Sequence, residues 1–187
     1  MNLFEYIREQ VLKQQRTSAK TSLNQVSAAI KKLAATKFKE GQKITDVGGG
    51  KYDKGIEHIK HHSGADAKVF DPYNRNKEHN DKVITDHLGK SDHVMSNNVG
   101  NVIEHDEHLH AHLQDCKNFM HPEHGEFHMS IYDGNRSGKG GESQGGESWQ
   151  RNSKLSDYVP HVKKVFPESE YDHSIKNGII SVKRKGK

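Results

Sequence analysis

The stretch Asp46-Val47-Gly48-Gly49-Gly50 decides the fold, because it follows a short apolar run and precedes a segment with helical spacing. Ile56 and Ile59 share one face of a helix predicted over residues 53–62, and Asp53 is placed to cap that helix. A second apolar run follows. Strand, helix and strand in this order form a βαβ unit, which implies parallel strands and a right-handed crossover.

Short apolar runs separated by helices and polar loops continue along the chain. They predict strands over residues 43–47, 67–70, 82–85, 93–96 and 126–132. Further helices are predicted over 104–118 and over 155–166, the second beginning near Pro160. A closing strand pair, 170–175 and 178–183, surrounds Lys176-Asn177-Gly178, a strong hairpin signal. The order predicts an α/β fold with a Rossmann-like, mostly parallel sheet.

The first 40 residues predict an N-terminal helical extension. Apolar residues recur at helical spacing in two groups: Leu3, Ile7 and Val11, then Leu23, Val26, Ile30 and Leu33. Ser22 is placed to cap the second helix, and Gly41 follows its end. We therefore divide the chain into an extension over residues 1–40 and a Rossmann-like domain over 41–187.

Composition indicates a folded protein with a very polar surface. The chain has 187 residues, which suits one domain, and only 30% of them are hydrophobic. The formal net charge is +4 with 15 histidines. Basic residues concentrate at 31–43 and 183–187. Such basic runs are ordinarily part of the solvated surface. The alternative is that they contact a phosphate backbone, which makes nucleic acid a candidate partner.

The single cysteine, Cys116, excludes an intramolecular disulfide and fits a reducing compartment, where we expect it to be a buried, inert thiol. No run approaches the roughly 18 apolar residues of a membrane span, and the start of the sequence lacks a signal-peptide pattern. We expect a cytoplasmic protein without membrane association. His105, His108 and His112 share a helical face, yet a solvated helix without a metal is the expected state.

The glycine stretch is also the strongest candidate for a binding site. Glycines allow a sharp turn and close approach to a ligand, although a plain tight turn has the same signature. Asp71 follows the next strand, where a carboxylate can accept hydrogen bonds from ribose hydroxyls. Asp71-Pro72-Tyr73-Asn74 is equally good turn chemistry. Together these signals favour a nucleoside-bearing cofactor, with Asp86 as a weaker candidate for contact with the adenine amino group.

Three segments resemble class I S-adenosylmethionine (SAM)-dependent methyltransferases. They are Asp46-Val-Gly-Gly-Gly-Lys51-Tyr52-Asp53, Phe70-Asp71-Pro72-Tyr73-Asn74-Arg75 and Ser96-Asn97-Asn98-Val99-Gly100-Asn101-Val102-Ile103. The likeness is greatest to small methyltransferase-like proteins of bacteriophages and some bacteria, and it covers most of the chain after residue 17. It implies a seven-stranded sheet whose last strand is antiparallel, and a location in the host cytoplasm if a phage encodes the protein.

The resemblance also implies roles for individual residues. Gly48 and Gly50 would line the methionine end of SAM, Asp71 the ribose, and residues 97–99, including Asn97 and Val99, the floor beside the methyl group. Asn97, Asn98 and Asn101 would orient the methyl acceptor. Asp46 would favour the positive sulfonium and ammonium of SAM, whereas it would repel the pyrophosphate of a nicotinamide dinucleotide.

The sequence thus predicts a SAM-dependent methyltransferase that acts on nucleic acid, DNA or RNA, or on a small nucleophile. Amino-methyltransferases of adenine or cytosine commonly carry Asn/Asp-Pro-Pro-aromatic where this chain has Ser96-Asn97-Asn98-Val99. This departure keeps two alternatives open: a non-catalytic protein that binds nucleic acid or a host protein, and an enzyme that degrades SAM. The glycine-rich stretch 134–148, with Trp149 after it, is either a lid or a structureless surface loop.

Overall fold

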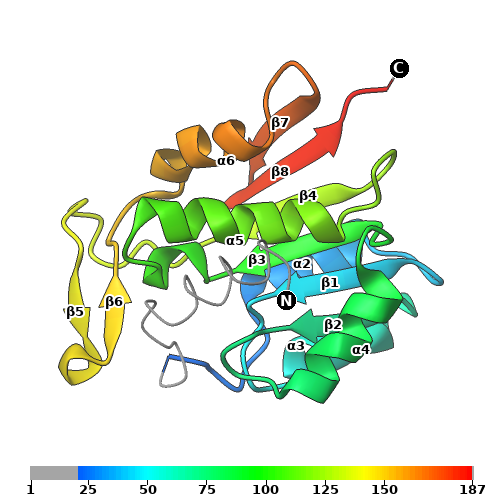
Figure 1. Cartoon of the computed structure of the whole chain (residues 1–187), viewed down its shortest axis with the longest axis horizontal. Coiled ribbons are helices and arrows are strands. Elements are labelled where there is room, and N and C mark those ends of the chain that lie inside the picture. Colours follow the sequence, from blue (N-terminus) through cyan, green and yellow to red (C-terminus); the bar gives the residue numbers. More distant parts are fainter. Residues whose placement is uncertain (1–20, 187) are drawn as a thin grey trace.

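The computed structural model describes residues 21–186, and a six-stranded sheet runs through its centre (Figure 1). The strands are Lys43–Val47 (β1), Asp66–Phe70 (β2), His93–Asn97 (β3), Glu126–Ser130 (β4), Tyr171–Lys176 (β7) and Ile179–Arg184 (β8). Their order is β2-β1-β3-β4-β8-β7. Strands β1 to β4 are parallel, and β8 is antiparallel to β4 and β7. The predicted mostly parallel Rossmann-like sheet with an antiparallel last strand is confirmed.

Helices cover both faces of the sheet. On one side lie Ala28–Thr36 (α2) and Lys54–Ser63 (α3), and on the other Lys77–His87 (α4), Asp106–Phe119 (α5) and Val159–Val165 (α6). Successive residues of a strand face opposite layers, so that Val94 joins the α5 core and Met95 joins the α2 core. Residues on both faces of β1 and β3 are therefore buried, including polar ones such as Thr45 and Ser96.

Helix α2 belongs to the layer that covers the sheet. Its residues Ile30 and Leu33 lie in the same buried cluster as Ile44 of β1 and Ile59 of α3. The part of the predicted N-terminal extension that the structure describes is therefore packed on the sheet. The helix predicted around Leu3, Ile7 and Val11 lies outside the described residues.

One predicted helix cap is wrong, and the other is confirmed in position only. Ser27, not Ser22, caps α2, and its hydroxyl oxygen accepts a 3.1 Å hydrogen bond from the Ile30 amide. Asp53 occupies the N-cap position of α3, but its side chain makes no capping bond within the described chain. Its carboxylate pairs instead with Arg75, 2.8 Å from Nη2. The tertiary ion pair replaces the local contact that the sequence predicted.

Residues 82–85 lie in helix α4, so the strand predicted there is wrong. Their β-branched side chains favour a strand locally, but Asn80, Val83 and His87 are buried at helical spacing. The Asn76 side chain caps the helix by accepting a 2.8 Å hydrogen bond from the His79 amide. The sheet consequently has six strands among the described residues, not the seven that the resemblance implies.

Strand β2 is therefore an edge strand, and α4 covers it. His79 Nε2 lies 2.7 Å from the Val69 carbonyl oxygen, and Lys68 forms an ion pair with Asp86. Side chains of α4 thus occupy the side of β2 where another strand would pair, which protects the sheet from edge-to-edge association.

The glycine-rich segment forms a hairpin, which corrects the prediction of no regular structure. Its strands are Gly141–Ser143 (β5) and Ser148–Gln150 (β6), drawn in yellow at the left of Figure 1. Glu142 pairs with Trp149 across the hairpin. A Cβ atom on Gly140 would lie 2.5 Å from the Trp149 ring, so this glycine allows the indole to lie directly against the backbone.

The remaining elements follow the sequence closely. Helices α3 and α5 begin and end within two residues of their predicted bounds, and Pro160 lies in the first turn of α6, after a 3₁₀ turn over Leu155–Tyr158 (η3). In the C-terminal hairpin Asn177 and Gly178 have φ values of 54° and 74°, which the tight turn requires. No helix within residues 21–186 has the length and apolar character needed to cross a membrane.

We predict that Asn76→Ala lowers the free energy of unfolding by about 1 kcal/mol, because it removes the side-chain cap of α4. Urea denaturation measures the change. Asn76→Asp is the matched control, since aspartate also caps helices well, and it should retain most of the stability. Equal destabilisation by both substitutions would contradict the capping role.

Candidate functional site

A cavity of about 580 Å³ opens where β1 and β3 end. Its volume is typical of a small-molecule site, and the carboxyl ends of the strands are where open α/β sheets bind ligands. The cavity brings together most of the residues that the sequence singled out, namely Asp46, Gly48, Gly50, Asn97, Asn98, Val99 and Asn101. Tyr132 and Trp149 complete its wall from the loop after β4 and from the hairpin.

The glycine loop has no room for side chains. Gly48 and Gly50 have left-handed φ values of 80° and 78°, which strain any other residue. A Cβ atom on Gly48 would lie 2.8 Å from a methyl group of Val99, and one on Gly49 would lie 2.7 Å from Asp46 Oδ2. The loop therefore brings bare backbone to the cavity wall between Asp46 and Val99.

Gly50 is held on both sides of its backbone. Its amide donates a 2.8 Å hydrogen bond to Asp71 Oδ2, and its carbonyl accepts a 2.8 Å hydrogen bond from Arg75 Nε. Arg75 in turn pairs with Asp53 at the start of α3. These contacts tie the end of β1, the loop after β2 and the first turn of α3 into one unit.

The same contacts correct the role predicted for Asp71. Besides Gly50, its carboxylate accepts hydrogen bonds from the amides of Tyr73 and Asn74, both at 2.9 Å, and from Asn74 Nδ2 at 3.0 Å. A carboxylate offers about four acceptor positions, and these bonds fill them. Asp71 is therefore the turn residue that the sequence allowed as an alternative, and it positions the glycine loop without a free oxygen for ribose.

Asp46 is the least satisfied polar group of the site. It is 4% exposed, and its Oδ1 has no hydrogen-bond partner within residues 21–186. Burial, with a further contribution from the nearby Asp71 charge, raises the pKa of Asp46 to about 7. A buried carboxylate without a partner is unfavourable, so a cation bound in the cavity would relieve the largest electrostatic cost there.

The asparagines after β3 have different environments. Asn97 Oδ1 accepts hydrogen bonds from Ser27 Oγ at 3.0 Å and Ser130 Oγ at 2.6 Å. Asn98 has a left-handed φ of 58°, its amide donates to the Ser130 carbonyl at 2.9 Å, and its side chain is exposed in the cavity wall. Of these two, Asn98 is therefore the one placed to contact an incoming molecule.

Asn101 fastens the hairpin to the site. It is 3% exposed, its Nδ2 donates to Gln150 Oε1 at 3.1 Å, and its Oδ1 accepts a 3.4 Å hydrogen bond from the Tyr132 amide. Gln150 Nε2 closes the network by donating to the Tyr132 carbonyl at 3.1 Å. The sequence predicted Asn101 as part of the site but did not predict its contact with Gln150, whose partners are 18 and 49 residues away.

Asp86 lies outside the cavity, at the other end of the sheet. Its carbonyl oxygen accepts a 3.0 Å hydrogen bond from Lys43 Nζ, and Lys43 is the first residue of β1. Its carboxylate pairs with Lys68. The predicted adenine contact depended on a strand over residues 82–85, and because that segment is a helix, Asp86 points away from the site.

The three helical histidines do not form one cluster. His112 is partly buried, its Nε2 lies 2.7 Å from Ser96 Oγ, and desolvation lowers its pKa to about 4. The rings of His105 and His108 contact each other instead, with centroids 5.4 Å apart. Cys116 is buried as predicted, and burial raises the pKa of its thiol, which keeps it protonated and unreactive.

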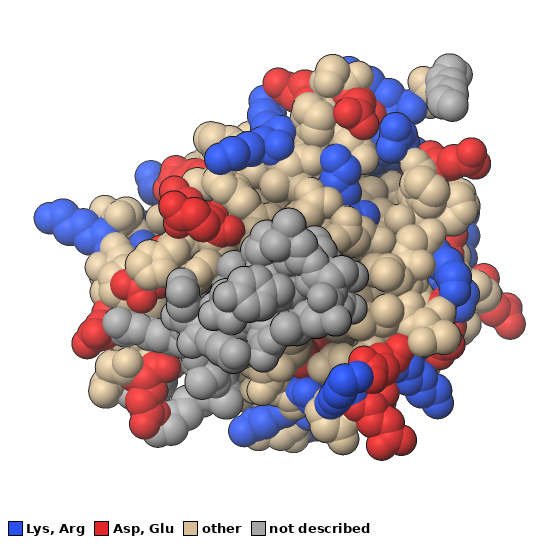
Figure 2. All heavy atoms as spheres, in the orientation of Figure 1, with Lys and Arg blue, Asp and Glu red and all other residues tan. Residues whose placement is uncertain are grey.

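Basic residues of both runs are paired with acids. Lys37 and Lys183 lie 3.1 and 3.5 Å from the carboxylate of Glu126, and Arg184 lies 3.5 Å from that of Glu170. On the face shown in Figure 2, Lys and Arg side chains of the described residues are interspersed with Asp and Glu. This face presents mixed charge where a phosphate backbone would require a continuous basic surface.

Comparisons with known proteins point to the fold. No known family model matches the sequence, and no curated protein is detectably similar to it. A Rhodobacter sphaeroides protein described as a candidate zinc-dependent alcohol dehydrogenase has a TM-score of 0.58, at 11% identity over 88% of this chain and 92% of that one. A candidate methyltransferase of Haloferax volcanii, solved with the Trm112 methyltransferase activator, has a TM-score of 0.52, at 12% identity over 86% and 89%.

A geranyl diphosphate C-methyltransferase of Streptomyces coelicolor, solved with S-adenosyl-L-homocysteine, has a TM-score of 0.51, at 9% identity over 84% of this chain and 77% of that one. At such identities the likeness concerns the fold alone. The chain has the Rossmann-like sheet found in SAM-dependent methyltransferases, as the sequence predicted. A phage or bacterial origin stays a prediction.

We predict that Gly49→Ala lowers the free energy of unfolding by about 1–3 kcal/mol, because its Cβ would overlap the Asp46 carboxylate. Gly141→Ala is the matched control, since a Cβ there meets no atom within 4 Å. Neither glycine has a left-handed φ, so steric overlap is the difference between them. Urea denaturation of both variants at one pH measures it, and equal stabilities would show that Asp46 moves aside freely.

Proposed function

We propose that the cavity binds SAM and that the protein is a SAM-dependent methyltransferase. The observation that carries the proposal is the buried carboxylate oxygen of Asp46, which has no partner among residues 21–186 and lies beside a loop of bare glycine backbone. SAM carries two cationic groups, the ammonium and the sulfonium, which suit this carboxylate. The Asp46 carboxylate would repel the pyrophosphate of a nicotinamide dinucleotide. This repulsion disfavours the alternative that a protein with this fold is a nicotinamide-dependent dehydrogenase.

Other residues of the wall fit the same cofactor. The first turn of α3, with Lys54, Gly55 and Ile56, lines the cavity, and amides of an uncapped helix start are suited to a carboxylate such as that of SAM. Val99, in contact with Gly48, supplies apolar surface. When bound, SAM supplies a methyl carbon activated by the positive sulfur. The protein's part is to hold that carbon in line with a nucleophile.

We place the methyl acceptor at the mouth of the cavity. Tyr132 is 64% exposed there, and Trp149 and Tyr52 line the same opening. Aromatic rings in such a position suit a planar acceptor, including a base of DNA or RNA, as well as a small nucleophile. Asn98 is the residue free to orient the acceptor, whereas Asn97 and Asn101 act as positioning residues because their side-chain oxygens already accept hydrogen bonds.

The binding proposal predicts that SAM affinity rises with pH. Asp46 attracts a cation only when ionised, and its pKa of about 7 means that ionisation is completed above neutrality. Calorimetric titration between about pH 5.5 and pH 8 should therefore show tighter binding at the higher pH. Asp46→Asn should bind at least about tenfold more weakly at the higher pH, about 1.4 kcal/mol, and with a flatter profile.

Asp86→Asn is the control for this titration, because Asp86 lies at the opposite end of the sheet and its loss should leave SAM affinity unchanged. NAD⁺ is the competing ligand. Absence of heat with both SAM and S-adenosylhomocysteine, or tighter binding of NAD⁺, would overturn the cofactor assignment. A pH profile that persists in Asp46→Asn would show that another group titrates.

The acceptor proposal predicts that Asn98→Ala lowers kcat by at least about tenfold while SAM affinity stays within about twofold. Methyl transfer from labelled SAM to DNA, RNA and small amines identifies the acceptor on which kcat is measured. Unchanged kcat would remove Asn98 from the acceptor site. SAM breakdown without any acceptor would identify a SAM-degrading enzyme, and SAM binding without turnover would identify a binding protein.

A further inference from the structure

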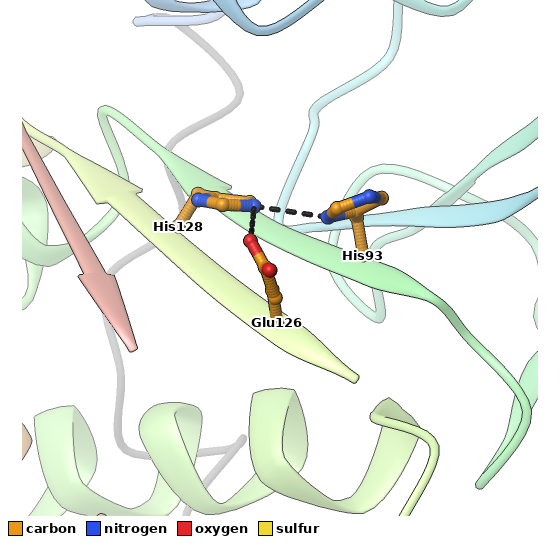
Figure 3. Close-up of side chains that lie close together, drawn as sticks. All are labelled: His93, Glu126 and His128. Atoms are coloured by element: carbon orange, nitrogen blue, oxygen red, sulfur yellow. Dashed lines mark hydrogen bonds and ion pairs between the residues drawn. The ribbon is translucent and has the colours of Figure 1, made fainter. Parts of the chain in front are cut away.

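Strands β3 and β4 carry a polar stripe on the face that α2 covers. His93 of β3 pairs in register with Glu126 of β4, and His128 follows Glu126 by two residues, so the three side chains share one face (Figure 3). The intervening Phe127 packs into the apolar core on the other face. Ionisable residues in a strand that is buried on both faces are unusual, and their alternation indicates a site with its own chemistry.

The three side chains point toward one another. His93 Nδ1 lies 3.1 Å from His128 Nε2, which lies 3.8 Å from Glu126 Oε2, and the three candidate ligand atoms all lie within 4.8 Å of one another. His93 is 5% exposed and His128 1%, while the Glu126 side chain is 14% exposed. The two imidazoles are therefore buried, and the Glu126 carboxylate is partly exposed to solvent.

Two imidazoles and one carboxylate are a ligand set that zinc uses. With metal–ligand distances of about 2.0–2.2 Å and tetrahedral angles, neighbouring ligand atoms lie roughly 3.3–3.5 Å apart. The spacings of 3.1 and 3.8 Å are already close to this geometry. The two facing ring nitrogens have room for one proton between them. A metal ion would take the place of that proton, which moves from His93 Nδ1 to Nε2 of the same ring, so that both imidazoles stay neutral.

The surroundings hold the rings in place for this role. His128 Nδ1 lies 2.9 Å from Ser181 Oγ, a contact that leaves Nε2 for the cluster when Nδ1 carries the proton. The Phe38 ring covers the cluster, with its centroid 5.1 Å from that of His93 and 6.3 Å from that of His128. A hydrogen-bonded ligand and an apolar cover are typical of metal centres.

We propose that His93, Glu126 and His128 bind a zinc ion. The site lies where β3 and β4 begin, and the cavity lies where β3 ends, so the metal would tie strands together beneath α2 without touching the methyl donor. Lys37 Nζ lies 3.1 Å from Glu126 Oε2 and forms an ion pair with the carboxylate that the zinc ion would bind. Metal binding therefore displaces Lys37, and the lysine is a competitor for the site.

The test is a titration of the chelator-treated full chain with Zn²⁺ against a metal indicator, with Co²⁺ as a spectroscopic probe of tetrahedral coordination. We expect one ion per chain with micromolar or tighter affinity. Glu126→Gln and His128→Gln should each weaken binding at least about tenfold. Lys37→Met should tighten it several-fold, an effect that misfolding cannot produce, while Lys32→Met on the exposed side of α2 should not.

The competing site is the pair of the partly exposed His121 and the exposed His124, whose ring centroids lie 3.6 Å apart. A double His121→Gln, His124→Gln variant should retain the tight site. Loss of binding in that variant, full retention in Glu126→Gln, or a Zn²⁺ affinity weaker than about 100 μM in the unmodified chain would overturn the proposal. Circular dichroism and SAM titration of each variant separate loss of the metal site from loss of the fold.

Discussion

The cavity depends on one constraint, a clamp formed by the hydrogen bonds that Asp71 and Arg75 make with the backbone of Gly50. Asp71 binds the amide of this glycine and Arg75 binds its carbonyl, so the loop after β1 is fixed from the loop after β2. Gly50 and Gly48 can accept this geometry only because glycine tolerates left-handed φ angles. The clamp sets where α3 begins and leaves the backbone of Gly49 pressed against Asp46.

Hydrophobic periodicity was sufficient to predict most of the sheet and the layers around it. It failed for residues 82–85, where three β-branched residues favour a strand locally but Asn76 and the buried residues Asn80 and His87 stabilise a helix. It also failed for the glycine-rich hairpin, whose order comes from Trp149 packing on Gly140 and from Gln150 contacting Asn101. Both failures concern specific contacts of side chains with backbone or with other side chains, which periodicity does not measure.

The candidate site was predictable in position and only partly in roles. Strand–glycine–helix order places Asp46, Gly48 and Gly50 together in any fold of this class. The role of Asp71 was not decidable from sequence, because a ribose ligand and a turn residue use the same acceptor oxygens, and only the four hydrogen bonds to the chain separate them. The stripe of His93, Glu126 and His128 was not predicted, because the sequence does not say which residues of two strands lie in register.

The two ends of β1, β3 and β4 differ in how their buried charges are compensated. Where the strands end, Asp46 is a buried carboxylate whose Oδ1 has no hydrogen-bond partner among residues 21–186, and burial raises its pKa to about 7. Where they begin, Lys37 and Lys183 surround Glu126, and burial keeps His93 and His128 neutral, so charge there is already compensated. Polar residues within an otherwise apolar core are expected at functional sites, where they contact a ligand. Among the described residues, a bound cation would therefore lower the electrostatic cost at the Asp46 end, whereas at the Glu126 end a metal ion would have to compete with Lys37.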